Sequence, residues 1–164
     1  MAISWSAMRK KLEKKNLCDS LQGRVQYFAT RYRETHDSEG GVALRVDGRE
    51  VFRSDFFKWA RVMFIDRTQS EAEEKSWQEL NMDSNVKGAF DQFGFYRAFY
   101  KYDNQCIEKS LESEDAVVRL FALLDKRVGK RTLGKLLPSV EQQPEWLRYF
   151  YRLRMESENI TQHE

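Results

Sequence analysis

The sequence predicts an α+β fold: an N-terminal helix, a three-stranded antiparallel meander, and a mostly helical C-terminal two thirds packed on the sheet. Apolar residues show helical spacing near the N-terminus, strand-like alternation around an Asp-Gly turn in residues 22–53, and helical spacing again from residue 54. Because the 164 residues are 41% hydrophobic and contain no internal repeat or linker, we expect one domain over residues 1–164.

The first expected helix begins at a Ser4 cap and ends near Cys18. Trp5, Met8 and Leu12 recur in it at helical spacing. Its lysines occupy other positions, namely Lys10, Lys11, Lys14 and Lys15. A basic amphipathic helix is usually a solvated surface helix, so we expect it to dock on the core by its apolar side.

Three short runs rich in β-branched and aromatic residues, 22–34, 42–46 and 49–53, predict the strands of the meander. Asp47-Gly48 is a two-residue hairpin turn of type I′, which needs positive φ at both positions. A regular hairpin would pair Val46 with Arg49, Arg45 with Glu50, Leu44 with Val51, and Ala43 with Phe52. It would also place four residues on the core face: Val42, Leu44, Val46 and Val51.

After the meander the pattern becomes helical. Four polar residues are expected to begin helices, Ser54, Ser70 (with Glu73 as a capping box), Asp91 and Ser113. Gly129 is expected to end the helix that starts at Ser113, and Pro144 to lie in the first turn of the last helix. Aromatic stripes such as Phe95 and Phe99 are interpreted as core.

Charge is segregated along the chain although the net charge is only +2. Residues 1–33 hold eight Lys or Arg and two acids, and residues 126–154 hold another eight and two, whereas residues 66–83 hold six acids and two bases. This segregation favours an anionic partner such as nucleic acid or phosphate. If folding interleaves the blocks, their fields cancel.

The cysteines and the terminal sequence indicate the compartment. Cys18 and Cys106 are far apart and form no CxxC pair, which predicts free thiols in a reducing environment. Residues 1–16 lack the uninterrupted apolar run of a secretory signal, and no other stretch approaches the length needed to span a bilayer, so neither a leader nor a membrane span is expected. We therefore expect a cytoplasmic protein without a membrane partner.

Residues 129–136 match the phosphate-binding pattern G-x-x-x-x-G-K-[ST] except at the last position, where Leu136 cannot hold Mg²⁺. A helix rather than a strand is expected before it, which argues against a nucleotide site. The surrounding basic segment nevertheless offers candidate phosphate contacts at Lys126, Arg127, Lys130 and Arg131. A solvated basic surface is the simpler interpretation.

The stretch TRYRETHDSEGG, residues 30–41, is a second candidate anion site. Alternation places Arg31 and Arg33 on the same strand face as Val25, about 7 Å apart, near the spacing of adjacent phosphates. His36 would add a titratable donor. The hypothesis is an anion-binding corner, and the simpler alternative is a bend between two strands.

Catalysis finds little support in the sequence. It contains no GxSxG, HExxH or Cys-His pair at a recognised spacing, and no cofactor or metal is expected. A small hydrolase would have to use His36 with Asp37 and Glu39. We name no catalytic residue and favour a binding protein, with a protein-protein regulator as the alternative because the aromatic-rich middle can expose a patch.

Three stretches, LQGRVQYFATRYRETHDSEG, VDGREVF and LFALLDKRVGKRTL, resemble a family of uncharacterised bacterial proteins of about this length with no assigned function. The resemblance spans most of the chain in one order and implies no activity, cofactor or catalytic residue. The family pattern has a larger residue where this chain has Gly41, which predicts a more flexible loop here.

Overall fold

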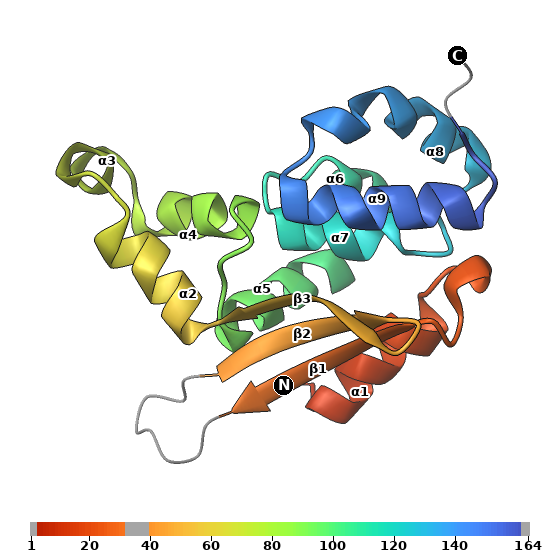
Figure 1. Cartoon of the computed structure of the whole chain (residues 1–164), viewed down its shortest axis with the longest axis horizontal. Helices are drawn as coiled ribbons and strands as arrows, with labels where there is room; N and C mark the ends of the chain where they lie inside the picture. Colours follow the sequence, from red (N-terminus) through yellow and green to blue (C-terminus); the bar gives the residue numbers. More distant parts are fainter. Residues whose placement is uncertain (1–2, 32–39, 162–164) are drawn as a thin grey trace.

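The structure, a computed structural model, describes residues 3–31 and 40–161, and it confirms the predicted α+β order (Figure 1). The strands are β1 (Val25–Arg31), β2 (Gly40–Val46) and β3 (Arg49–Asp55). The helical elements are α1 (Trp5–Lys10), η1 (Lys11–Lys15), η2 (Asp19–Leu21), α2 (Phe56–Ala60), η3 (Arg61–Ile65), α3 (Gln69–Glu74), α4 (Trp77–Val86), α5 (Gln92–Asp103), α6 (Ile107–Leu111), α7 (Ala116–Leu123), α8 (Lys130–Leu136), η4 (Leu137–Gln142) and α9 (Glu145–Ser157).

The sheet is an antiparallel meander in the order β1-β2-β3. The predicted hairpin turn is confirmed, because Asp47 and Gly48 have φ values of 53° and 82°. The predicted pairs Val46–Arg49 and Arg45–Glu50 are also found.

Beyond these pairs the predicted register is wrong. A β-bulge shifts the pairing, so that Leu44 lies opposite Phe52 and Ala43 opposite Arg53. A bulge adds one residue to one strand and therefore reverses the alternation after it. As a result Phe52, rather than Val51, is buried on the core face.

Two predicted helix caps are wrong by one or two residues. Asp55, not Ser54, caps α2, while the buried Ser54 hydroxyl accepts a hydrogen bond from the Phe90 amide at 2.8 Å. Asp115, not Ser113, caps α7. Ser54 directly precedes Asp55, and Ser113 lies two residues before Asp115; in both places the charged aspartate oxygen is the stronger acceptor for the amides of the first turn.

Other helix ends agree with the sequence to different degrees. Ser4 and Asp91 cap α1 and α5 as predicted. Ser70 lies inside α3 rather than before it, and Pro144 lies just before α9. Gly129 precedes α8 instead of ending the previous helix, because that helix, α7, already ends at Leu123.

The core lies behind the sheet in Figure 1, where α5 packs on it and α7 lies between α5 and α9. The buried Tyr27 of β1 contacts Phe95 of α5 and Phe121 of α7, with ring centroids 6.0 and 6.2 Å apart. The basic N-terminal helix docks on this core through Met8 and Leu12, as the sequence predicts.

The N-terminal segment is tied to the turn after α7 by backbone hydrogen bonds. The Cys18 amide donates to the Leu124 carbonyl at 2.9 Å, and the Lys126 amide donates to the Asn16 carbonyl at 2.7 Å. From α9, the buried Arg154 donates to the Val128 carbonyl at 2.7 Å. Segments more than 100 residues apart in sequence are therefore held side by side.

Gly41 lies in β2 rather than in the loop to which the sequence assigned it. It is buried in β2, and a Cβ atom there would lie 2.7 Å from the Ser54 carbonyl oxygen and 2.8 Å from the Asp55 Cβ. These distances are shorter than real Cβ contacts, so β3 can approach this closely only because residue 41 has no side chain.

Replacing this glycine should therefore destabilise the sheet. We expect Gly41→Ala to lower the free energy of unfolding by about 1–3 kcal/mol, the usual cost of overpacking. Gly134→Ala is the matched control: in α8 its Cβ would meet no atom within 4 Å, and alanine should stabilise that helix by up to about 1 kcal/mol. Urea unfolding of both variants tests this, and wild-type stability of Gly41→Ala would disprove the close approach.

Candidate anion-binding surface

The hydrogen bond between Asn16 and Lys126 brings two basic stretches of the chain to one place. Leu17 and Asp125 form an isolated antiparallel bridge beside it. The last residues of η1 therefore lie next to the turn that leads into α8. We call the cations at this junction the basic seam, and they are Lys14, Lys15, Lys126, Lys130 and Arg131.

All five side chains of the basic seam are exposed. Within the described part of the chain, none of them forms an ion pair with a carboxylate. Their charges are therefore not compensated by close contacts, in contrast to cations such as Arg24, which binds Asp47 at 2.8 Å. Exposed cations that lack partners are available for phosphate groups.

Arg127 differs from its neighbours because its guanidinium binds the buried Asp125. The Asp125 carboxylate accepts from the Arg127 amide (2.8 Å), from Arg127 Nε (3.0 Å) and Nη2 (2.7 Å), and from the Tyr102 hydroxyl. Four donors occupy its acceptor positions, so no lone pair remains for a general base. The cluster is structural, and the charge of the half-exposed Arg127 is already paired with Asp125, unlike the charges of the basic seam.

These contacts also set the charge state of the cluster. Burial alone would raise the pKa of Asp125, but hydrogen bonds from Arg127 and Tyr102 outweigh it and lower the pKa below its usual 3.8. Burial, with the neighbouring carboxylate, raises the pKa of the Tyr102 hydroxyl. Asp125 is therefore ionised and Tyr102 is neutral at physiological pH.

The structure places the sequence-predicted site residues in different ways. Lys126 lies at the hydrogen bond to Asn16, and Lys130 and Arg131 follow it in the first turn of α8. Arg31 ends β1, where its backbone pairs with Gly40, at the lower left of Figure 1, whereas α8 lies at the upper right. The end of this strand and the basic seam are therefore at different ends of the molecule.

Two other predicted residues, Arg33 and His36, lie outside the described residues, so the hypothesis of an anion-binding corner stays a prediction. The sequence analysis missed Lys14 and Lys15 as site residues. It had identified the basic block that contains them, but no local pattern shows that η1 lies beside residue 126. The link is a backbone hydrogen bond across 110 positions.

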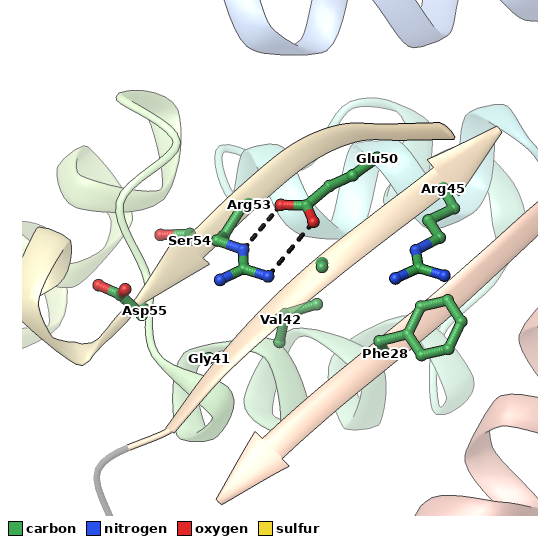
Figure 2. Close-up of a pocket in the computed structure, with 9 residues that line it drawn as sticks. Phe28, Gly41, Val42, Arg45, Glu50, Arg53, Ser54 and Asp55 are labelled. Atoms are coloured by element: carbon green, nitrogen blue, oxygen red, sulfur yellow. Dashed lines mark hydrogen bonds and ion pairs between the residues drawn. The ribbon is translucent and has the colours of Figure 1, made fainter. Parts of the chain in front are cut away.

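The open face of the sheet is a second cationic surface, shown in Figure 2. It surrounds a shallow cavity of about 170 Å³ whose lining includes Phe28, Arg45, Glu50 and Arg53. The guanidinium carbons of Arg45 and of Arg9, from α1, lie 4.6 and 4.9 Å from the centre of the Phe28 ring. These cation–π contacts hold both guanidinium groups beside the Phe28 ring.

The charges on this face largely cancel, however. Arg53 Nε binds Glu50 at 2.7 Å, Arg9 binds Glu13 at 2.9 Å, and the carboxylate of Asp55 also borders the cavity. A phosphate bound at this cavity would be repelled by these carboxylates. The basic seam, with no such compensation, is therefore the better site for a polyanion.

Several classes of site lack support among the described residues. Residues 130–136 form α8 and follow a helix and a turn, so the partial phosphate-loop pattern is not a phosphate loop. In residues 3–31 and 40–161 no group of three or more His, Cys, Asp or Glu is placed to hold a metal ion. No helix in these ranges is long and apolar enough to cross a membrane. Cys18 and Cys106 are both free thiols.

The buried Asp125 gives a test of its structural role. Because its pKa is lower in the folded protein than in the unfolded chain, its stabilisation is complete above the unfolded value of 3.8 and is lost as the pH falls through the folded value. We expect Asp125→Asn to lower the free energy of unfolding by about 2–4 kcal/mol at pH 7. The difference from wild type should shrink below pH 4.

Urea unfolding between pH 3 and 7 measures this difference. Asp103→Asn is the control, because Asp103 pairs with Lys11 at the surface and its loss should cost less than about 1 kcal/mol. A difference for Asp125→Asn that does not depend on pH would contradict an ionised carboxylate in this cluster.

Comparison with known proteins identifies one family. The model of the SF0329 protein family matches residues 4–155, which include the sheet, α8 and the basic seam. No curated protein and no solved structure matches the chain.

Proposed function

We propose, for a chain that belongs to the SF0329 protein family, a non-catalytic role in which the basic seam binds a polyanion, with nucleic acid as the leading class. The observation that carries this proposal is the backbone link between Asn16 and Lys126, which joins the two segments of the chain that carry the five exposed cations without described carboxylate partners. Nucleic acid carries closely spaced phosphates, and their neutralisation releases counterions.

The geometry of the seam favours contacts with phosphates over contacts with bases. Its cations come from η1, from a turn and from α8, which are held together by the core, so they lose less freedom on binding than cations on a loose tail would. The seven-residue α8 offers little length for reading base edges in a groove. The proposed binding is therefore independent of nucleotide sequence.

The proposed setting is the bacterial cytoplasm. Two free thiols, one buried and one exposed, are compatible with a reducing compartment. A small hydrolase is the less supported alternative, since His36 lies outside the described residues and Asp125 has no free acceptor position.

A salt titration tests the proposal. We expect the wild-type protein to bind a fluorescent 20-nucleotide single strand at low salt, with log K falling linearly as log salt rises. Replacing three seam cations with glutamine, Lys126→Gln, Lys130→Gln and Arg131→Gln, should weaken binding to all sequences alike. It should also reduce the salt slope by about 0.7 per lost phosphate contact. Fluorescence anisotropy measures both quantities.

The matched control replaces three exposed lysines elsewhere: Lys87→Gln, Lys101→Gln and Lys109→Gln. It removes the same net charge and should change affinity much less than the seam variant. An equal loss in both variants would show that net charge alone acts. No measurable affinity of the wild type at low salt would rule out the nucleic-acid role.

A further inference from the structure

The segment from α2 to α4 exposes large apolar side chains to an unusual extent. We define the apolar patch as Phe57, Phe64, Ile65 and Trp77, whose exposed fractions are 62%, 63%, 74% and 56%. Phe64 and Trp77 contact each other directly, with ring centroids 6.1 Å apart. Exposed aromatic side chains gathered in this way mark interaction sites more often than single exposed residues do.

The apolar patch is anchored rather than loose. The half-buried Trp59 contacts both Phe64 and Trp77, at centroid distances of 5.8 and 6.0 Å. Its indole Nε1 donates to Asn81 Oδ1 at 2.9 Å, which fixes the ring. The rings above it are therefore held in place before any partner arrives, which lowers the entropy cost of binding.

Buried contacts beneath the patch also hold its segment together. Met63 and Leu80 point inward from η3 and α4 and are buried. Arg67, which follows η3, is linked to α4, because its guanidinium donates to the Leu80 carbonyl at 2.7 Å. These contacts already join η3 to α4, so the exposed rings are available for another molecule.

The surroundings of the patch are acidic. Residues 56–83, which include all four patch residues, contain six acids and four bases. Glu73, Glu74 and Glu79 are exposed and form no ion pair with a cation of the described residues, whereas Asp83 binds Lys75 at 2.5 Å. An acidic border opposes a nucleic acid or an anionic bilayer and attracts cations.

We propose that the apolar patch docks an amphipathic segment of another protein, one that presents bulky apolar side chains flanked by lysines or arginines. The apolar side chains of the partner would pack against the exposed aromatic rings and cover them from water. Its lysines or arginines would pair with the carboxylates around the patch. This function is independent of polyanion binding. In Figure 1 the segment from α2 to α4 lies on the left and α8 on the right, so both surfaces can be occupied at once.

Synthetic peptides of matched helicity test the proposal by isothermal titration calorimetry. One peptide carries leucines on one face with lysine flanks, a second carries the same leucines with glutamate flanks, and a third is the scrambled lysine peptide. We expect the first to bind at least tenfold more tightly than the other two. Ile65→Ser and Phe64→Ser should each weaken its binding at least fivefold.

Tyr149→Ser is the control variant, because Tyr149 is 43% exposed but lies on α9, outside the patch. It should leave the affinity unchanged, and circular dichroism should show that all variants are folded. Equal binding of the lysine and glutamate peptides, or no effect of the patch variants, would overturn the proposal.

Two further outcomes would assign the patch to another occupant and so overturn the proposal. One is a dimer in light scattering that Ile65→Ser dissociates, which would identify a second copy of this chain. The other is binding to phosphatidylcholine vesicles that Ile65→Ser abolishes, which would identify a lipid surface. The proposal requires that the protein is a monomer, does not bind the vesicles and binds the lysine-flanked peptide.

Discussion

The buried guanidinium of Arg154 fixes the turn between α7 and α8, to which the N-terminal segment and α9 are both hydrogen-bonded. It is 2% exposed and donates to the carbonyls of Leu124, Asp125 and Val128. Carbonyls in a turn have no helical partner, and buried ones need a donor. The guanidinium is planar and has several N–H donors, so it can bind all three carbonyl oxygens at once. The turn between α7 and α8 is therefore held in a fixed shape.

The fixed turn between α7 and α8 also determines where the charged residues beside it lie. Asp125 binds Arg127 and Tyr102, while the neighbouring backbone pairs with residues 16–18 of the N-terminal segment. The acids and bases that are paired here are buried or half-buried, and the cations left over project outward. The same contacts that stabilise the turn thus separate a neutralised structural cluster from the uncompensated basic seam.

Three surfaces of this protein carry exposed charged side chains, and the local balance of charge decides what each can bind. On the open face of the sheet, carboxylates offset the arginines around Phe28. On the basic seam, no described carboxylate offsets the lysines. Around the apolar patch the sign is reversed, because exposed glutamates border Trp77 and its neighbours. The basic seam and the apolar patch lie at opposite ends of the molecule and are bordered by charges of opposite sign, so each favours a different one of the two proposed partners.

The sequence by itself determined the order of helices and strands, the Asp47-Gly48 turn and the docking of the first helix, because these depend on local periodicity and on φ preferences. Only the tertiary structure decided three features: the bulge that buries Phe52 instead of Val51, the close approach at Gly41, and the hydrogen bond between Asn16 and Lys126. Each of these results from contacts between residues distant in sequence, and no local pattern encodes such a contact. Composition therefore revealed that basic blocks exist, whereas packing decided that two of them are joined at the hydrogen bond between Asn16 and Lys126.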